Sequence, residues 1–197
     1  MITSMRIHQD VIATDGGVRA TWAEVNLARL EYNLAAITHR VAPAKVMLVV
    51  KANAYGHGLI EVSKALAGKA DYVGVAVLEE GILLRELGIT APIIVLGGIW
   101  GDQILRYLQH DLTLTASSVE RLRQIDAVAA QIGVKAKVHL KIDTGMERIG
   151  IHYYSAHLLQ EAALKCRHVA VEGIFSHFAN ADSCDLAHAR LQLERFH

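Results

Sequence analysis

The stretch Val46-Met-Leu-Val-Val-Lys-Ala-Asn-Ala-Tyr-Gly-His-Gly58 joins a short apolar, β-branched run directly to a lysine and a glycine-containing turn. Such a run is typical of a strand that is covered on both faces, as strands of parallel sheets are. The stretch therefore predicts a buried strand whose carboxyl end carries a charged side chain, followed by a tight turn.

Five further runs of the same kind follow, and segments with helical spacing of their apolar residues separate them. The predicted strands are residues 46–50, 72–77, 93–96, 112–115, 137–142 and 169–175. The clearest helix is expected over Ser118–Ile132, with Ser117 or Ser118 as its N-cap and Gly133 at its C-terminal end. Strands separated by single helices predict βαβ crossovers and hence a parallel sheet.

The predicted strands begin 19 to 32 residues apart, which suits either a doubly wound sheet or a (β/α)8 barrel. The first strand lacks the GxGxxG turn of a dinucleotide-binding fold, so we predict an α/β fold of the (β/α)8 TIM-barrel type. About six βα units are visible and two are missing. Trp22–Val41 predicts a short strand and a helix, and a last helix is expected from about Asp185 to His197.

Composition excludes several classes of protein. The chain has 197 residues, 52% of them hydrophobic, with 20 Lys+Arg and 20 Asp+Glu, and no basic face suited to nucleic acid. The longest apolar run is too short to span a membrane, and the N-terminus does not resemble a secretory signal, so a cytoplasmic protein is expected. We predict a loose leader over residues 1–18 and a barrel domain over residues 19–197.

Cysteine and histidine usage gives no sign of a metal or a disulfide. Cys166 and Cys184 have no CxxC or CxxH neighbour and are expected to be free thiols. The eleven histidines are dispersed, without HxH or HExxH spacing. No metal site is predicted.

Lys51 and Tyr55 are the first candidates for chemistry, because active sites of barrels form at the carboxyl ends of the strands. A lysine that ends a buried strand either extends to solvent or serves as a desolvated amine, whose pKa is lowered as Schiff-base chemistry requires. The Tyr55 hydroxyl would face the same space. The alternative is a solvated charge beside a rim aromatic.

Two later strand ends carry further candidates. Lys141 and Asp143 lie two residues apart on one face of a predicted strand, and Arg148 follows them with a guanidinium that could orient an oxyanion. The alternative for this group is a surface ion pair. His177 follows the last predicted strand, where it could act as an acid or a base or stack on a ring. The alternative is a histidine buried in the core.

Several motifs together resemble the alanine racemases. Residues 50–58, Val-Lys-Ala-Asn-Ala-Tyr-Gly-His-Gly, are similar to the pyridoxal-phosphate attachment motif of that family. Segments 78–88, 92–97, 141–150 and 176–182 also resemble the family, in its order, so the resemblance runs from about residue 19 to the end. It implies a fold-type III pyridoxal-phosphate enzyme with an N-terminal (β/α)8 barrel and a C-terminal β domain.

The resemblance implies a role for each candidate at the cofactor. Lys51 would be the Schiff-base lysine, Tyr55 would bond the phosphate, and Arg148 would bond the pyridine 3-oxygen. His177 would pack beside the ring, and Leu96 would lie near the cofactor. Through this resemblance the sequence predicts a pyridoxal 5'-phosphate site.

For the substrate, the resemblance places Arg148 and Met146 near the carboxylate, with Met146 acting from the neighbouring subunit of a homodimer. Lys141 corresponds to the lysine that is often carbamylated in the family and steadies Arg148. Lys51 would be one of two catalytic bases, and a tyrosine in the partner's C-terminal domain would be the other.

The implied activity is the interconversion of L-alanine and D-alanine, which supplies D-alanine for peptidoglycan. The C-terminal β domain is absent from these 197 residues, so we expect that they do not form a competent racemase alone. Alternatives are a serine or broad-spectrum amino-acid racemase, a non-catalytic pyridoxal-phosphate-binding protein, or a structural module.

Overall fold

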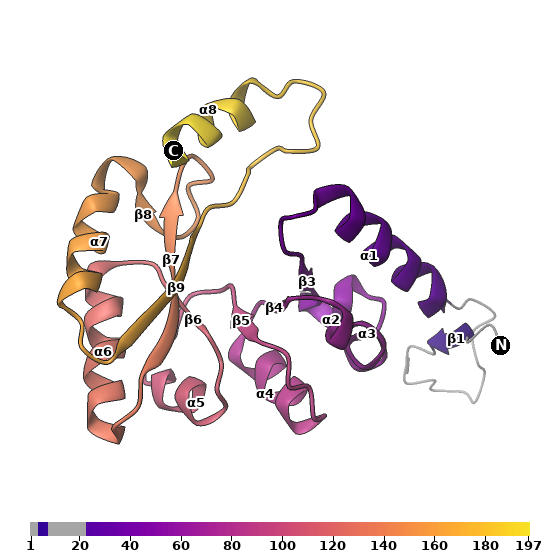
Figure 1. The fold of residues 1–197 in the computed structure, drawn as a ribbon, viewed down its shortest axis with the longest axis horizontal. Helices are drawn as coiled ribbons and strands as arrows, with labels where there is room; N and C mark the ends of the chain where they lie inside the picture. The colour runs from indigo at the N-terminus through magenta and orange to yellow at the C-terminus, as the bar shows by residue number, and fades with distance from the viewer. Residues whose placement is uncertain (1–3, 8–22) are drawn as a thin grey trace, which may run out of the picture. The chain divides into compact units, whose positions relative to one another are not determined.

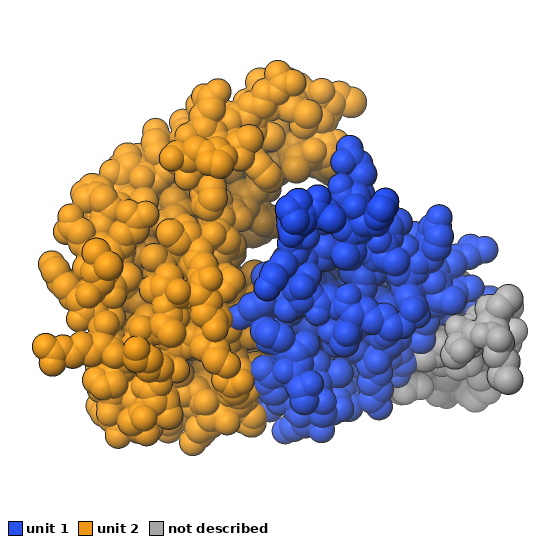
Figure 2. All heavy atoms as spheres, viewed as in Figure 1, with its two compact units in different colours: residues 1–75, 82–92 blue, residues 76–81, 93–197 orange. Residues whose placement is uncertain are grey.

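The computed structural model describes residues 4–7 and 23–197. The chain divides into two compact units, residues 1–75 with 82–92 and residues 76–81 with 93–197, which Figure 2 shows in different colours. The boundary falls inside helix α4 (Leu78–Glu86), so each unit contains part of that helix.

The first unit is built on two pairs of strands. β1 (Ser4–Ile7) pairs antiparallel with β2 (Ala23–Asn26), and β3 (Met47–Val49) pairs in parallel with β4 (Tyr72–Val75). Between β3 and β4 the chain forms α2 (Lys51–Tyr55), α3 (Leu59–Leu66) and the 3₁₀ turn η1 (Ala67–Lys69), as Figure 1 shows in part. This is the βαβ crossover that the sequence predicts, although β3 is half-buried and not covered on both faces as expected.

Helix α1 (Leu27–Val41) follows β2, which confirms the strand and helix predicted over Trp22–Val41. The helix begins at Asn26, whose side-chain oxygen accepts a hydrogen bond of 3.1 Å from the Arg29 amide. α1 contacts α3, and an ion pair of 2.5 Å joins Glu31 to Lys69 at the end of the α3–η1 segment. The first unit is therefore held together by contacts between helices as well as by its sheets.

Of the expected leader, residues 1–18, only residues 4–7 lie among the described residues. They form β1, with Ser4 opposite Asn26 and Ile7 opposite Ala23. A strand of four residues that pairs with a single neighbouring strand is too short to show a recognisable pattern in the sequence. The rest of the expected leader lies outside the described residues.

The second unit contains a set of parallel strands. β6 (Leu114–Ala116) and β9 (Val169–Phe175) pair with the two edges of β7 (Ala136–Asp143), and β5 (Ile93–Val95) joins β6 through a bridge between Ile94 and Thr113. A short strand, β8 (Ile151–His152), pairs with the end of β7. Because these strands are parallel, their carboxyl ends lie at the same edge of the sheet.

Three helices connect these strands: α5 (Ile104–Gln109), α6 (Val119–Ile132) and α7 (Ala156–Lys165), the last after the 3₁₀ turn η2 (Tyr153–Ser155). Helix α8 (Ala187–Phe196) follows the last strand, β9. α6 has the predicted ends. The Ser118 hydroxyl accepts a hydrogen bond of 3.1 Å from the Arg121 amide, and Gly133 closes the helix in the left-handed conformation, with φ 70°.

Side chains from the strands and from α6 and α7 form the core of the second unit. The fully buried members include Ile93, Ile94, Val95, Leu114, Ala116, Leu122, Ile125, Ala129, Val138 and Leu159. Their burial on strands with helices between them fits the prediction of a parallel sheet. Cys166 and Cys184 are free, as predicted.

The six predicted strands correspond to β3, β4, β5, β6, β7 and β9. The structure adds β1 and β8, which are too short to show a pattern, and the predicted last helix is α8. Among the helices of the described residues, none has the length and apolar character needed to cross a membrane.

Candidate active site

The candidate residues lie at or just beyond the carboxyl ends of strands, in one group for each unit. In the first unit, Lys51 and Tyr55 follow β3. In the second unit the group follows β5, β7 and β9 and consists of Leu96, Lys141, Met146, Arg148 and His177. Within each unit, these are the ends of the strands at which catalytic residues of barrel enzymes are found.

Lys51 begins a turn of left-handed helix rather than a glycine turn. Ala52, Asn53, Ala54 and Tyr55 all have positive φ, between 52° and 56°. Each such residue costs about 1–2 kcal/mol relative to the right-handed form. The turn is held by hydrogen bonds from the Ala54 amide to the Val50 oxygen, 2.8 Å, and from the Gly58 amide to the Asn53 oxygen, 3.0 Å. Such a run outside glycine is typical of strain at a functional site.

Asn53 ties this left-handed turn to helix α3. Its side-chain oxygen accepts a hydrogen bond of 2.8 Å from the Leu59 amide, at the start of a helix whose N-cap residue, Gly58, has no side chain to do so. Lys51 is half-buried and Tyr55 is 60% exposed, so the lysine is shielded more than the tyrosine. Sequence reasoning missed Asn53, although an asparagine before a helix is a usable signal.

Lys141 lies on β7 and is buried, with 3% of its surface exposed. Its amine donates a hydrogen bond of 3.2 Å to the Ile142 oxygen and lies 5.1 Å from the centre of the Phe175 ring. Burial is the main cause of a lowered pKa of the Lys141 amine. The nearby Asp143 carboxylate raises this pKa, and the positive charge of Arg148 lowers it further. Because Lys141 and Asp143 are both 3% exposed, the alternative of a surface ion pair is wrong.

Asp143 organises the loop that follows β7. Its Oδ1 accepts hydrogen bonds from the amides of Gly145, 2.8 Å, and Met146, 2.9 Å. Burial acts to raise the pKa of Asp143, but the Gly145, Glu147 and Met146 amides, with Lys141, hold it below its usual value. The carboxylate is therefore a fixed part of the loop that carries Met146 and Arg148.

This depressed pKa gives a prediction for stability. A carboxylate with a lowered pKa in the folded state stabilises the protein above its ordinary pKa of 3.8, and the effect is lost as pH falls through the folded value. Asp143→Asn should lower the free energy of unfolding by about 2 kcal/mol near neutral pH. Urea unfolding of both proteins should show a smaller difference below pH 3.8. A difference independent of pH would contradict the role of the charge.

The loops after β5 and β7 approach each other. A Cβ atom added to Gly98 would lie 3.4 Å from Cδ1 of Ile149, within van der Waals distance. Leu96 and Met146 are half-buried and Arg148 is exposed, so the guanidinium is accessible to a ligand. These three residues therefore lie on two loops that the second unit brings side by side.

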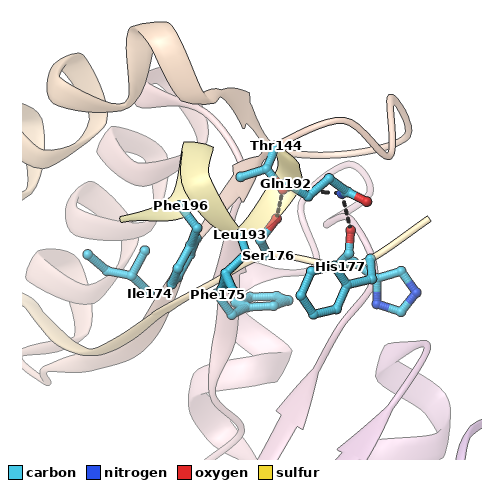
Figure 3. A pocket seen from close by; sticks show the side chains of 9 residues that line it. Thr144, Ile174, Phe175, Ser176, His177, Gln192, Leu193 and Phe196 are labelled. Atoms are coloured by element: carbon cyan, nitrogen blue, oxygen red, sulfur yellow. Dashed lines mark hydrogen bonds between the residues drawn. The ribbon is translucent and has the colours of Figure 1, made fainter. Parts of the chain in front are cut away.

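His177 has an exposed side chain, so the alternative of a core histidine is wrong. It lines a cavity of about 340 Å³ with Thr144, Phe175, Ser176 and Gln192, which Figure 3 shows together with Ile174, Leu193 and Phe196. A hydrogen bond of 2.7 Å joins the hydroxyls of Thr144 and Ser176. The cavity joins the ends of β7 and β9 to helix α8.

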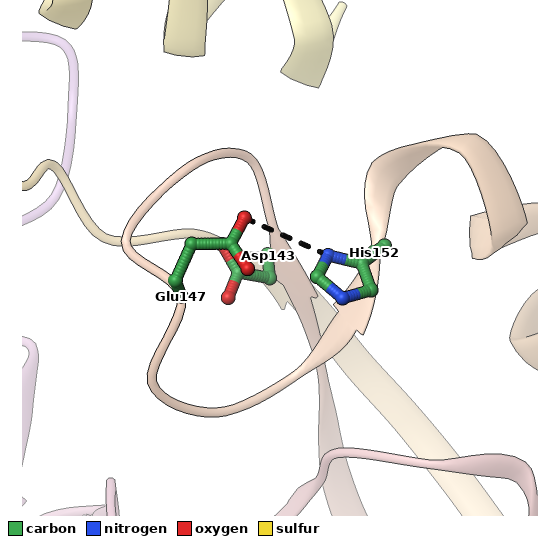
Figure 4. A group of neighbouring side chains, drawn as sticks. All are labelled: Asp143, Glu147 and His152. Atoms are coloured by element: carbon green, nitrogen blue, oxygen red, sulfur yellow. Dashed lines mark ion pairs between the residues drawn. The ribbon is translucent and has the colours of Figure 1, made fainter.

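One cluster resembles a set of metal ligands. Asp143, Glu147 and His152 have ligand atoms within 4.8 Å of one another (Figure 4). Asp143 Oδ1 is occupied by two amides, however, and the Glu147 carboxylate lies 3.8 Å from Nδ1 of a partly exposed His152. The arrangement is explained by the structural role of the Asp143 carboxylate beside a surface pair of Glu147 and His152, and we do not assign a metal site to it.

Parallel βα units with candidate residues at the carboxyl ends of their strands are typical of the α/β barrel class of fold. Comparison with solved structures supports this fold. An alanine racemase from Clostridium difficile 630, in complex with cycloserine, matches 86% of this chain and 48% of its own, with a TM-score of 0.82 and 38% identity. One from Streptomyces lavendulae has a TM-score of 0.81 and 33% identity, over 86% of this chain and 46% of its own.

The sequence comparisons give the same result. The family model described as the alanine racemase N-terminal domain matches residues 25–197, so the chain belongs to the alanine racemase family. Alanine racemase 2 of Caldanaerobacter subterraneus is 44% identical over 182 residues, 91% of this chain and 47% of that protein. The Carboxydothermus hydrogenoformans alanine racemase is 41% identical over 91% of this chain. The chain spans about half the length of these curated relatives.

Proposed function

We propose that the protein to which this chain belongs is an alanine racemase that uses pyridoxal 5'-phosphate. One observation carries the proposal: the lysine of the attachment motif follows the half-buried strand β3 and the buried Val50, in a chain whose residues 25–197 match the N-terminal domain of that family. The wider proposal includes a homodimer in the cytoplasm and a role in supplying D-alanine for peptidoglycan.

The residues present fit the proposed cofactor. Lys51 offers a half-buried primary amine, and no hydrogen bond or ion pair to this amine is seen among residues 4–7 and 23–197. The exposed Tyr55 hydroxyl suits a phosphate oxygen, and the exposed Arg148 guanidinium suits the pyridine 3-oxygen. The His177 ring would pack against the cofactor, with Leu96 nearby. Lys51 would hold the cofactor covalently.

In the reaction, this chain's residues would bind the substrate and move one proton. Pyridoxal phosphate, when bound, supplies an electron sink for negative charge at the amino acid's Cα. Lys51 would remove or return the Cα proton on one face, with its Nζ as the base. Arg148 and Met146 would hold the substrate carboxylate, Met146 from the neighbouring subunit. The second base is expected outside these 197 residues.

Lys141 would support Arg148 as a carbamate. Its amine is buried and its pKa is lowered by that burial, which favours the neutral, nucleophilic form. The amine nitrogen would add to carbon dioxide and release a proton, and the resulting anion would then face the Arg148 guanidinium. The proposed carbamate would hold that guanidinium at the cofactor.

The test of the proposed function is an assay of the full-length protein. With pyridoxal phosphate, it should convert L-alanine into D-alanine, and chiral chromatography of the products measures the rate. A panel with serine and other amino acids tests the substrate. The 197-residue chain is the matched control and should show no turnover, because it provides only one of the two bases.

Each outcome separates the alternatives. Equal or faster turnover of serine would favour a broad-spectrum or serine racemase. Bound pyridoxal phosphate without turnover of any amino acid would contradict a racemase and favour a protein that only binds the cofactor. Turnover of L-alanine by the 197-residue chain would contradict the expected need for a second base beyond it.

A further inference from the structure

Helix α8 is attached to the ends of β7 and β9 by one buried amide. Gln192 is 1% exposed, although it lies on a helix whose neighbouring residues, Leu191 and Leu193, are exposed. Glutamine is rarely buried this completely unless its amide is hydrogen-bonded. The sequence motifs and the proposed roles above leave Gln192 unexplained.

The hydrogen bonds of Gln192 fix the orientation of its amide. Nε2 donates to the His177 main-chain oxygen, 2.9 Å, and to the Thr144 hydroxyl, 3.2 Å, while Oε1 accepts from the Ala179 amide, 2.9 Å. A carbonyl oxygen accepts only and an amide N–H donates only, so the opposite orientation would lose both main-chain bonds. Figure 3 shows the bond from Gln192 to the main chain of His177.

These bonds join two loops that carry proposed cofactor and substrate residues. Thr144 precedes Met146 and Arg148 on the loop after β7, and its hydroxyl also bonds Ser176, 2.7 Å away. The main chain at residues 177–179 carries the His177 ring. Gln192 therefore adds a bridge between the start of one loop and the backbone of the other, beyond the pairing of Lys141 with Phe175 and the bond between Thr144 and Ser176.

A second contact from α8 reaches the same loop. The Arg195 guanidinium donates a hydrogen bond of 3.0 Å to the Thr144 main-chain oxygen and lies 4.7 Å from the centre of the Tyr153 ring. Nε2 of His188 lies 3.2 Å from the Gly145 oxygen. α8 is thus fixed on the β7 loop at three points, and Gln192 alone among these three side chains also bonds the main chain after β9.

We propose that Gln192 is a positioning residue for pyridoxal-phosphate binding, which acts by holding the His177 main chain against the β7 loop. This inference rests on the proposed function for the identity of the cofactor. It assigns Gln192 no contact with the cofactor or the substrate. Its effect passes through His177 and through the loop of Met146 and Arg148.

Gln192→Glu is the sharpest variant, because glutamate has the same length and shape but its carboxylate cannot donate. It would direct an oxygen at the His177 oxygen and repel it. The full-length variant should bind pyridoxal phosphate about tenfold more weakly and lose about tenfold in kcat/KM for alanine, since displacing a positioned group by an ångström has effects of this size or larger. Gln124→Glu, at an exposed site on α6, is the matched control and should match the wild type.

The decisive measurement is a titration of each apo-protein with pyridoxal phosphate, followed by its fluorescence, beside the melting temperature. A folded fraction that is merely smaller would reduce the amplitude and leave the dissociation constant unchanged. Wild-type affinity and kcat/KM in Gln192→Glu, or a lowered melting temperature alone, would overturn the proposal. If the wild type binds the cofactor but racemises no amino acid, the proposed function fails while the titration still tests Gln192.

A second variant keeps the proposal testable if Gln192→Glu does not fold. Thr144→Val preserves the side chain's size and removes the hydroxyl that Gln192 and Ser176 share. It should also weaken pyridoxal-phosphate binding, but less than Gln192→Glu does, because the two main-chain bonds of Gln192 remain. Unchanged binding in Thr144→Val would then count against the coupling of the two loops.

Discussion

Lys51→Arg in the full-length protein is expected to lower kcat/KM for alanine by at least about 1000-fold, the scale of losing a residue that reacts covalently. Arginine keeps the positive charge and much of the length of lysine, but its guanidinium does not form an imine. Lys51 is half-buried at the end of β3, where the loss of attachment cannot be replaced by another amine of the same turn. Steady-state kinetics with L-alanine measure the effect.

Covalent attachment gives an independent check of Lys51. Borohydride reduction of the wild-type complex should fix the cofactor to the peptide that contains Lys51, and mass spectrometry of a digest locates it. The matched control is Lys64→Arg, an exposed position on α3 in the same unit, which should retain wild-type kinetics. Cofactor label on another lysine, or full activity in Lys51→Arg, would contradict the assignment.

Gly97→Ala should destabilise the second unit, because among the described glycines an added Cβ atom comes closest to another atom at this position. A Cβ atom at residue 97 would lie 2.3 Å from the Ala76 main-chain oxygen, which the Gly97 amide also bonds at 3.1 Å. Backbone on both sides of this contact cannot move aside as a flexible side chain would. The free energy of unfolding should fall by about 3 kcal/mol, near the upper end for overpacking. Urea unfolding of the 197-residue chain measures this change.

A matched substitution separates the contact from the loss of glycine itself. At Gly68 an added Cβ atom meets nothing within 4 Å, and no positive φ is required there. Gly68→Ala should therefore change the free energy of unfolding by less than about 1 kcal/mol, in the stabilising direction. Equal effects at Gly97 and Gly68 would show that the close approach to Ala76 does not determine the result. Because Gly97 adjoins Leu96, its loss should also shift that residue.

Local patterns in the sequence predict most elements of the fold, since buried strands and capped helices have patterns of their own. α6 is the clearest case, because Ser118 and Gly133 each supply the backbone interaction that its ends need. β8 could not be predicted, because two residues cannot show a period. Lys51, Tyr55, Lys141, Arg148 and His177 could be selected as candidates because they lie at or beyond the carboxyl ends of predicted strands, whereas Leu96 and Met146 were indicated only by the family resemblance.

Two parts of the candidate site depend on contacts that local sequence does not encode. Gln192 becomes buried only when α8 packs against Thr144 and His177, which are distant in sequence. The left-handed conformation of Ala52–Tyr55 is also unexpected, because alanine and tyrosine favour the right-handed form. In both cases tertiary context overrides the preference of the individual residues.

The left-handed turn after Lys51 also sets a condition for transplanting this site into another scaffold. In a mirror-sense turn, the Cα–Cβ bonds of successive residues leave the axis in directions that a right-handed helix does not offer. A designed protein that copied Lys51 and Tyr55 onto an ordinary helix would reproduce their separation along the chain and lose their relative orientation. The unit to be grafted is the backbone from Val50 to Leu59, with Asn53 as the side chain that closes it.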